Sequence, residues 1–377
     1  MKKIIYADHA ATTKMSEAAY LAMVDCMKRD YANPSSLYQL SRYARQKLRE
    51  AREKIAGLIG AKPQEIYFTS GGTESDNWAV KGVAGLYPGQ RKRIITSSIE
   101  HHALLRSCEF LEAWGYEIVH LPVNPEGVVA QQMLEKAIDE NTILVSVMLA
   151  NNEVGTIQPI GDLTHITHKR NIPFHTDAVQ AVGHIPVNVQ ELGVDMLSAS
   201  AHKFGGPRGI GFLYVREGCE IVPFHHGGGQ ENGVRAGTED VASIVSMSVA
   251  LEESCKEMER SAVKLRELES IILDELDEIG ISYRLNGSRK KLPGLMSLSF
   301  PGLDGEKIMH RLDMLGVCVS TGSACNSRET EVSHVLRAIV MGDEYARGTI
   351  RISLGKDNTP KEAQEIAVRL KKAVGYI

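Results

Sequence analysis

Short apolar segments alternate with segments of helical periodicity from about residue 65 to residue 215. Strands are expected at residues 65–69, 93–97, 116–121, 142–148, 172–176, 195–198 and 209–215. Helices are expected from Thr73 onward and at residues 102–114, 130–138 and 161–169. Fully apolar strands that alternate with helices are typical of a mostly parallel sheet covered on both faces. We therefore predict an α/β fold for this part of the chain.

The pattern changes after about residue 255. Residues 261–280 predict a long amphipathic helix, which leads to strands near 281–285 and 296–300, a helix at 305–315 and a strand at 317–320. A helix, a strand and a last helix complete a smaller α+β unit. The 377 residues exceed the size of about 250–300 residues at which a single core stops growing, so two domains are expected.

The composition excludes several classes of protein. The chain has 43 Lys and Arg against 47 Asp and Glu, a net charge of −4, so nothing supports binding to nucleic acid or to an anionic membrane surface. The six cysteines are scattered without a CxxC pair, and His102, His225 and His226 have no partner at metal-ligand spacing. The N-terminus does not resemble a signal peptide and no apolar run would cross a bilayer. We expect a cytoplasmic protein without a bound metal.

Polar side chains follow five of the predicted strands, at the point where each strand ends. In a parallel α/β sheet, ligands gather at the carboxyl ends of the strands. These positions are occupied by residues 70–74, 100–102, 151–153, 177–180 and 200–203. Loops are polar in any protein, but this regular placement favours a ligand site at one edge of the sheet.

Three of these segments have both a structural and a functional interpretation. Residues 70–73 either cap a helix or hold an anion on its N-terminus. Lys203 is either a solvated lysine or a semi-buried amine that forms a Schiff base. Asp177 either caps a turn or keeps the pyridine nitrogen of a pyridoxal cofactor protonated. The structural interpretation is favoured for each residue alone, but their joint occurrence on neighbouring strands favours the functional one.

Nine segments together resemble one family. They are YADHAATT at residues 6–13, NPSS at 33–36, TSGGTESDN at 69–77, EH at 100–101, NNEVG at 151–155, HTDAVQ at 175–180, SAHK at 200–203, RAGT at 235–238 and STGSAC at 320–325. In this order they resemble the NifS/IscS-type cysteine desulfurases of the class V aminotransferase superfamily. The resemblance covers nearly the whole chain, and its motifs are together highly specific.

The resemblance implies a fold and a cofactor. The fold is that of the pyridoxal phosphate-dependent transferases of the aspartate aminotransferase type. Residues 12–257 would form a large cofactor-binding domain, and residues 1–11 with 258–377 a small α+β domain. The residues that match the site for pyridoxal 5′-phosphate are Lys203 for the imine, Asp177 for the pyridine nitrogen, Gln180 for the phenolic oxygen and His101 for ring stacking and proton transfer.

Further residues match the phosphate and substrate sites of the family. The phosphate would be held by Gly72, Thr73, Ser200 and His202, with Thr238 contributed by the other subunit of a homodimer. Asn152, which is also counted among the cofactor contacts, and Arg351 would bind the carboxylate of the substrate.

The implied reaction removes sulfur from L-cysteine and leaves L-alanine. A protein thiolate takes up the sulfur as a persulfide, and the residue that matches this nucleophile is Cys325. It lies among small and polar residues that are expected to form a movable loop, and Arg328 would favour its thiolate. Cys318 is expected in the core. A sulfur-acceptor protein is implied, such as an iron–sulfur scaffold or a thiolation enzyme, but the sequence does not identify it.

Two alternatives remain open. The first is a related pyridoxal enzyme, either a selenocysteine lyase or an aminotransferase, for which a loop thiol is not required. The second is a non-catalytic binding protein of the same fold, which would have no need of Lys203, Asp177, His101 and Cys325 together. Mutation of Cys325 distinguishes the first alternative, and the visible colour of a bound pyridoxal cofactor distinguishes the second.

Overall fold

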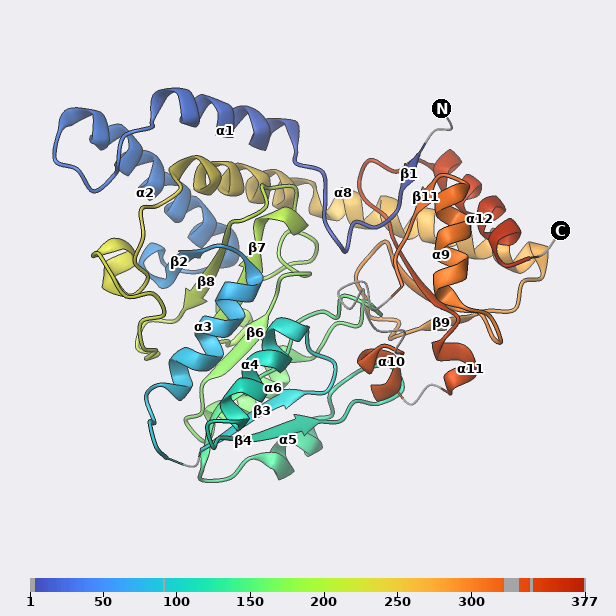
Figure 1. Ribbon diagram of the computed structural model, residues 1–377, viewed down its shortest axis with the longest axis horizontal. Helices are drawn as coiled ribbons and strands as arrows, with labels where there is room; N and C mark the ends of the chain where they lie inside the picture. Colours follow the sequence, from blue (N-terminus) through green and yellow to red (C-terminus); the bar gives the residue numbers. More distant parts are fainter. Residues whose placement is uncertain (1–3, 91, 322–331, 340–341, 376–377) are drawn as a thin grey trace.

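The computed structural model describes residues 4–90, 92–321, 332–339 and 342–375. A large unit and a smaller unit lie side by side, and one long helix, α8 (Val241–Ile279), runs along both (Figure 1). The N-terminal strand and the C-terminal helix both belong to the smaller unit (Figure 1). The chain therefore passes between the two units near its start and again along α8.

A seven-stranded sheet forms the centre of the large unit. In spatial order its strands are β2 (Ile66–Thr69), β8 (Gly211–Val215), β7 (Met196–Ser200), β6 (Phe174–Asp177), β5 (Thr142–Ser146), β3 (Arg93–Ser97) and β4 (Glu117–Leu121). β8 runs antiparallel to both of its neighbours, and the other pairs of this sheet are parallel. The predicted α/β fold with a mostly parallel sheet is confirmed.

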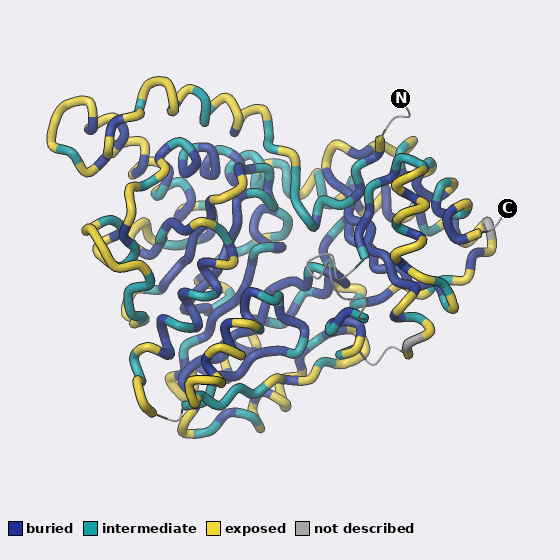
Figure 2. Tube along the Cα trace, in the orientation of Figure 1, coloured by how far each residue is buried: buried dark blue, intermediate teal, exposed yellow. Residues whose placement is uncertain are grey.

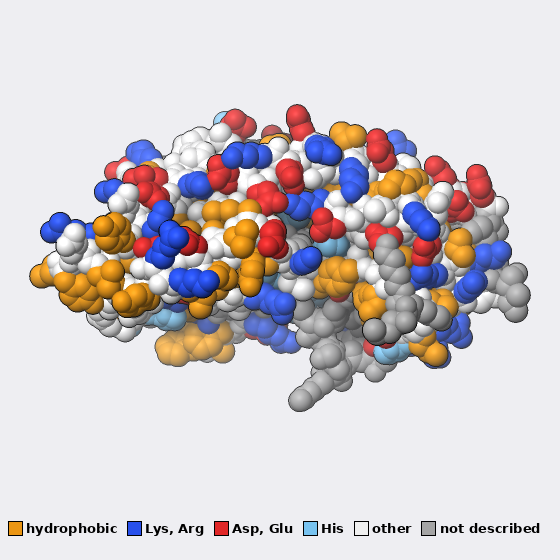
Figure 3. All heavy atoms as spheres, turned by 90° about the horizontal axis from the view of Figure 1, so that it is seen from above, with side chains coloured by type: hydrophobic (Ala, Val, Ile, Leu, Met, Phe, Trp, Pro, Cys, Tyr) orange, Lys and Arg blue, Asp and Glu red, His pale blue; other side chains and the backbone are white. Residues whose placement is uncertain are grey.

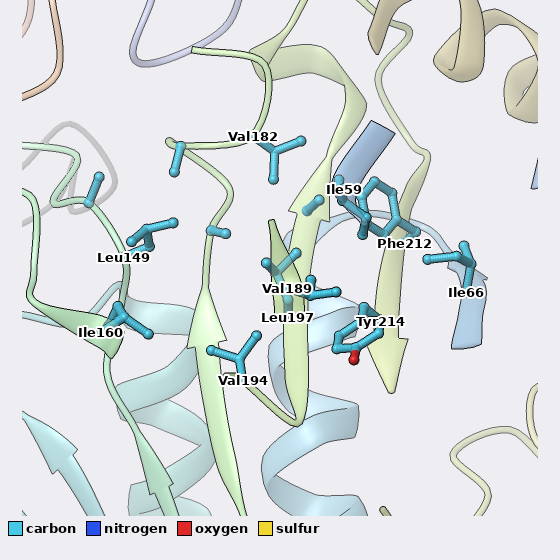
Figure 4. Close-up of a cluster of buried hydrophobic side chains, with 14 of the residues drawn as sticks. Ile59, Ile66, Leu149, Ile160, Val182, Val189, Val194, Leu197, Phe212 and Tyr214 are labelled. Atoms are coloured by element: carbon cyan, nitrogen blue, oxygen red, sulfur yellow. The ribbon is translucent and has the colours of Figure 1, made fainter. Parts of the chain in front are cut away.

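Helices cover both faces of this sheet. One face packs against α2 (Gln39–Ile59), α5 (Gln131–Ala137), α6 (Ile160–His168) and the first half of α8. Leu197, Phe212 and Tyr214 are fully buried on this side (Figure 4). The other face packs against α3 (Gly72–Ala84) and α4 (His102–Glu112), where Trp78 and Leu104 are fully buried. Because both faces are covered, ligands can approach the sheet only at its ends.

The smaller unit contains two sheets. β12 (Thr349–Ser353), β10 (Leu295–Ser299) and β9 (Arg284–Asn286) form an antiparallel sheet in that order. β1 (Ile5–Tyr6) pairs in parallel with β11 (Val317–Cys318). Apolar residues of α9 (Gly305–Met314), α12 (Pro360–Ala373) and the second half of α8 pack against these strands. The other α-helices in the described part of the chain are α1 (Glu17–Arg29), which packs on α8, and the short α7 (Val189–Leu192), α10 (His334–Ala338) and α11 (Asp343–Ala346).

Each unit has its own hydrophobic core, and Figure 2 shows buried segments of the chain inside both units. Ile5 and Ala7 belong to the core of the smaller unit, whereas Ala10 belongs to that of the large unit. Leu292 and Leu295 pack into the large-unit core although they follow α8 in the chain. The domain boundaries at residues 11/12 and 257/258 stay a prediction.

Helix α8 is much longer than the helix predicted at residues 261–280. It begins at Val241, where Oδ1 of Asp240 accepts a hydrogen bond from the backbone N–H of Ser243 at 3.1 Å. Both α1 and α2 pack against α8, and its first half is rich in small residues, so no single apolar stripe marked it in the sequence. Among the residues that the structure describes, no helix has the length and apolar character needed to cross a membrane.

Candidate active site

Residues predicted at the site gather at the carboxyl edge of the large sheet. Asp177 ends β6, His202 and Lys203 lie in the turn after β7, and His101 precedes α4. Burial is the largest cause of the pKa shift in all three titrating groups: it lowers the pKa of His101 and His202 and raises that of Asp177. The positive charge of Lys203 lowers the pKa of each of them as well. These four side chains therefore lie close to one another, as the sequence predicted.

Gly71 and Gly72 make a tight turn between β2 and α3. Gly71 has a φ of 144°, in a region that L side chains rarely adopt. A Cβ on Gly72 would lie 2.5 Å from Cγ2 of Val179, and one on Gly71 would lie 3.4 Å from Oγ of Ser200. The first N–H groups of a helix have no partner within it. A glycine turn and a serine hydroxyl at the start of a 13-residue helix, with Thr73 in its first turn, therefore suit a phosphate.

Asp177 is almost completely buried, with 5% of its surface exposed. Its Oδ1 accepts a hydrogen bond from the backbone N–H of Val179 at 2.9 Å. Burial raises the pKa of Asp177 to about 6, against the opposing effects of that N–H and of Lys203. A buried carboxyl group is stabilised in its charged form by a positive partner, so Asp177 is suited to face a protonated ring nitrogen.

His101 is the N-cap of α4. Its Nδ1 accepts a hydrogen bond from the backbone N–H of Ala103 at 3.1 Å. Burial and the charge of Lys203 lower the pKa of His101 to about 4. The imidazole is therefore neutral near pH 7 and carries its proton on Nε2, where it can be donated.

Lys203 and Gln180 are both tied to the N-terminal segment. Nζ of Lys203 donates to the carbonyl oxygens of Ala10 at 2.6 Å and Ala11 at 2.9 Å. Nε2 of Gln180 donates to the same oxygen of Ala10 at 2.9 Å. The amine is therefore held in a half-buried position beside Asp177.

The two residues predicted to bind a substrate carboxylate also meet. Arg351 lies on β12 with 4% of its surface exposed, and its Nη1 donates to the carbonyl oxygen of Asn152 at 2.9 Å. Its Nη2 donates to Oδ1 of Asp8 at 2.8 Å. Asn152 follows β5, so this contact joins the smaller unit to the edge of the large sheet.

Thr238 and Cys325 are the remaining predicted residues. Thr238 is exposed in the loop that precedes α8. Cys325, with Arg328, lies outside the described residues. Cys318 was expected in the core, but it is only half-buried, because it is the last residue of the two-residue strand β11, of which only Val317 is buried. No cluster of three potential metal ligands occurs in the described part of the chain.

Comparison with known proteins identifies the family. Residues 5–366 match the family model described as aminotransferase class-V. "Cysteine desulfurase IscS" of Dictyoglomus turgidum is 51% identical over 363 residues, which are 96% of this chain and 92% of that protein. A solved "NifS-like protein" has a TM-score of 0.93 at 38% identity and covers 99% of this chain and 100% of its own. The solved "SspA in complex with cysteine" has a TM-score of 0.84 at 36% identity, with 94% and 100% covered.

The chain belongs to the cysteine desulfurases of the class V aminotransferase family. The resemblance found in the sequence is confirmed, and with it the pyridoxal phosphate-dependent transferase fold. Members of this family use pyridoxal phosphate. The residues present fit that group. The space that a side chain on Gly72 would fill lies at the N-terminus of α3, and the buried carboxyl group of Asp177 lies near the amine of Lys203.

A buried polar network beside Asp177 in this desulfurase was missed in the sequence. His175 is fully buried, with Nδ1 2.8 Å from Oγ of Ser146 and Nε2 2.9 Å from Oγ of Ser198. Oδ1 of Asp76, on α3, lies 3.8 Å from Nε2 of His175. Burial lowers the pKa of His175 to about 3, whereas burial and the neighbouring Asp177 raise that of Asp76 well above its usual range.

Burial affects two neighbouring carboxyl groups to different extents. Two buried carboxylates do not both ionise easily at close range. The pKa of Asp76 is raised well above its usual range and that of Asp177 only to about 6, so Asp177 is the more readily ionised of the two. The signal available in the sequence was the spacing of His175 and Asp177, which are two residues apart on one strand and so share a face.

Glu100 is a further buried acid near the site. Its Oε1 accepts from the backbone N–H of Met148 at 2.9 Å and contacts Oγ of Ser97. Its Oε2 has no hydrogen-bond partner among the described residues. Burial raises the pKa of Glu100 from 4.5 to about 8, so the folded protein binds a proton that the unfolded chain has already released at neutral pH.

Replacing Glu100 with glutamine is expected to reduce the pH dependence of stability. The pKa of Glu100 is higher in the folded protein than in the unfolded chain. Its contribution to the free energy of unfolding is therefore fully present below pH 4.5 and is lost as the pH rises toward about 8. The wild type should thus lose unfolding free energy relative to Glu100→Gln across this window. Denaturant unfolding of the cofactor-free proteins at several pH values measures the difference, with the exposed Glu112→Gln as control. Parallel curves for wild type and Glu100→Gln would contradict the expectation.

Proposed function

We propose that this protein removes the sulfur of L-cysteine, leaves L-alanine, and carries the sulfur away as a persulfide on Cys325. The observation that carries the proposal is the convergence of Lys203, Asp177 and His101 at one sheet edge. The contact of Arg351 with the loop after β5 adds a cation suited to an amino-acid carboxylate. The similarity to a protein solved in complex with cysteine supports this substrate.

Different residues of this chain would hold different parts of pyridoxal phosphate. Gly72, Thr73, Ser200 and His202 would hold its phosphate, Asp177 its ring nitrogen, Gln180 its phenolic oxygen and Lys203 its aldehyde carbon. When bound, the cofactor supplies an electron sink for the pair that remains when the Cα proton of the substrate leaves. The charge on Asp177 sustains that sink by keeping the ring nitrogen protonated.

Four side chains act on the substrate itself. Arg351 and Asn152 orient its carboxylate, so that the Cα–H bond is presented in one direction. Lys203 is placed to accept the Cα proton on Nζ. His101, neutral and protonated on Nε2, is placed to move a proton to or from the reacting sulfur or carbon.

The sulfur step requires a thiolate. The thiolate of Cys325 attacks the substrate sulfur, a new S–S bond forms, and the bond from that sulfur to Cβ breaks. The electron pair of the broken bond stays with Cβ, which becomes the methyl group of L-alanine after protonation. L-Cysteine and the Cys325 thiol thus yield L-alanine and a Cys325 persulfide, with the sulfur oxidised and Cβ reduced.

The proposal includes partners and a location. The active form is a homodimer in which Thr238 of each subunit completes the phosphate site of the other. Exposed apolar side chains near α1 and α2 support a second copy on this end of the molecule, where Figure 3 shows hydrophobic side chains gathered; they include Tyr31 at 74% and Leu37 at 90% exposure. A sulfur-acceptor protein, an iron–sulfur scaffold or a thiolation enzyme, receives the persulfide sulfur. The protein acts in the cytoplasm.

Replacing Asp177 with asparagine tests the proposed chemistry. The variant should retain the visible absorbance of bound cofactor but produce alanine from L-cysteine at least about a hundredfold more slowly, because an uncharged amide does not keep the ring nitrogen protonated. Alanine and sulfide are measured together, with the exposed Asp162→Asn as control. Normal turnover in Asp177→Asn, or no alanine from the wild type, would refute the proposal.

A further inference from the structure

The N-terminal segment of residues 6–13 contacts four residues of the proposed site. The carbonyl groups of Ala10 and Ala11 bind Lys203 and Gln180. Oγ1 of Thr12 lies 3.1 Å from Nδ1 of His202, and Asp8 pairs with Arg351. The segment passes between the two units (Figure 1). It therefore connects the cofactor residues on the large sheet with the substrate cation on the small sheet.

Contacts other than the one with Arg351 fix the backbone position of Asp8. Asp8 forms a bridge with Ser353 of β12, and the next residue donates its N–H to the carbonyl oxygen of Ser353 at 3.0 Å. The hydroxyl of Tyr6 donates to the carbonyl oxygen of Asp8 at 3.0 Å. The backbone at Asp8 is thus held from two sides, and its carboxylate reaches Nη2 of Arg351 at 2.8 Å.

Arg351 has an unused donor although it is buried. Asp8 occupies Nη2, the carbonyl oxygen of Asn152 occupies Nη1, and Nε has no hydrogen-bond partner among the described residues. Buried N–H groups without a partner are rare in folded proteins, because losing water without replacement is unfavourable. A guanidinium group that is held by two partners and still has an unpaired N–H donor is suited to bind a carboxylate ligand.

We propose that Asp8 is the positioning residue for Arg351, and that it holds the guanidinium so that its remaining donors meet the α-carboxylate of the substrate. An arginine side chain has many rotamers, and a buried ion pair with a fixed carboxylate selects one of them before the substrate arrives. The inference rests on the proposed function only in taking an α-amino acid as the substrate.

Electrostatic repulsion between Asp8 and the substrate would change the affinity in the opposite direction. The negative charge of Asp8 also repels a second carboxylate near Arg351, so removing it would tighten substrate binding if repulsion outweighed positioning. The titratable and charged side chains that interact with this pair include Tyr6, His9, Cys318 and Glu153, and Arg208 interacts with Tyr6. The direction of the change in affinity on mutation therefore decides between the two effects.

The test measures binding without sulfur chemistry. L-Alanine, which has the α-carboxylate but no thiol, is titrated into the cofactor-loaded protein, and the change in absorbance gives its Kd. Asp8→Asn should raise this Kd by about tenfold or more, as expected when one partner of a buried charge pair is removed. Ethylamine, which lacks the carboxylate, should bind equally to wild type and variant. The exposed Asp357→Asn is the matched control.

A double-mutant cycle shows whether Asp8 acts through Arg351. In an Arg351→Ala background, Asp8→Asn should change the Kd of L-alanine by less than about twofold. If Asp8→Asn does not fold, as judged by its Tm, Asp8→Glu carries the same test, with a smaller rise because the charge remains but its distance changes. An unchanged or lower Kd, or an equal loss with ethylamine, overturns the inference. Failure of the desulfurase proposal alone would appear as an absence of alanine from L-cysteine with the effect on L-alanine binding intact.

Discussion

Replacing Lys203 with alanine is expected to abolish both the visible absorbance of the bound cofactor and all measurable turnover of L-cysteine. The amine is the group that we propose to link covalently to pyridoxal phosphate, and it lies between the carbonyl oxygen of Ala10 and Asp177. The loss should be roughly 10⁴-fold or larger, as for other residues whose removal eliminates a covalent step. Absorbance spectra and alanine formation are measured on the same preparation.

The control for this variant is Lys361→Ala, an exposed lysine on α12, which should behave as wild type. The far-UV circular dichroism of Lys203→Ala should be unchanged, because the lost hydrogen bonds to Ala10 and Ala11 join two turns and belong to no α-helix or sheet. A yellow Lys203→Ala protein that still makes alanine would remove Lys203 from the site.

The same variant tests the proposed homodimer. Lys203→Ala and Thr238→Ala subunits are mixed under conditions that exchange subunits. If Thr238 reaches the partner's site, each mixed dimer regains one complete site, because one site then has both wild-type residues. Recovery of about a quarter of wild-type activity at equal mixing is expected, since half of the dimers are mixed and each has one of two sites. No recovery, or a fully active monomer, would contradict the dimer.

Replacing Cys325 with alanine is expected to stop persulfide formation while leaving cofactor and substrate binding intact. Sulfur release from L-cysteine should fall by at least about a hundredfold, because the step that breaks the bond between sulfur and Cβ needs an attacking thiolate. Binding of L-alanine should keep its wild-type Kd. Mass spectrometry after a pulse of L-cysteine should find the added sulfur on the peptide that contains Cys325 and on no other.

The structure explains why the other cysteines are poor substitutes. Burial raises the pKa of every cysteine in the described residues: to about 11 for Cys26, to about 12 for Cys108 and Cys219, and upward for Cys255 and Cys318. A thiol with a raised pKa supplies little thiolate near neutral pH. Cys318→Ala is therefore the matched control and should release sulfur at the wild-type rate.

Retained sulfur release in Cys325→Ala would have a specific meaning. Alanine formed at the normal rate without a persulfide on the protein would favour a lyase, and transfer of the amino group to a keto acid would favour an aminotransferase. Sulfur found on Cys318 would move the nucleophile to β11, against its raised pKa. Each outcome contradicts the persulfide proposal in a different way.

Local chemistry of the chain was sufficient to predict much of this protein. The alternation of apolar strands and helices predicted the parallel sheet, because the two periodicities follow directly from backbone geometry. Lys203 and Asp177 were found because residues at the ends of adjacent parallel strands share an edge. The order of nine motifs identified the family. None of these predictions required knowing which distant segments pack together.

Tertiary structure alone decided the contacts that complete the site. Asp8 and Arg351 are 343 residues apart in the chain, and Lys203 lies 193 residues from the Ala10 carbonyl group that it binds. The periodicity of a single sequence does not reveal such pairs, because each partner is a polar residue on a short strand or loop, like many others in the chain. The raised pKa of Asp76 likewise depends on the burial of this α3 side chain and on its proximity to Asp177, since water would keep an exposed aspartate ionised. The sequence by itself therefore determined the sheet, its reactive edge and the family, whereas packing determined which groups meet there and which of them carry charge.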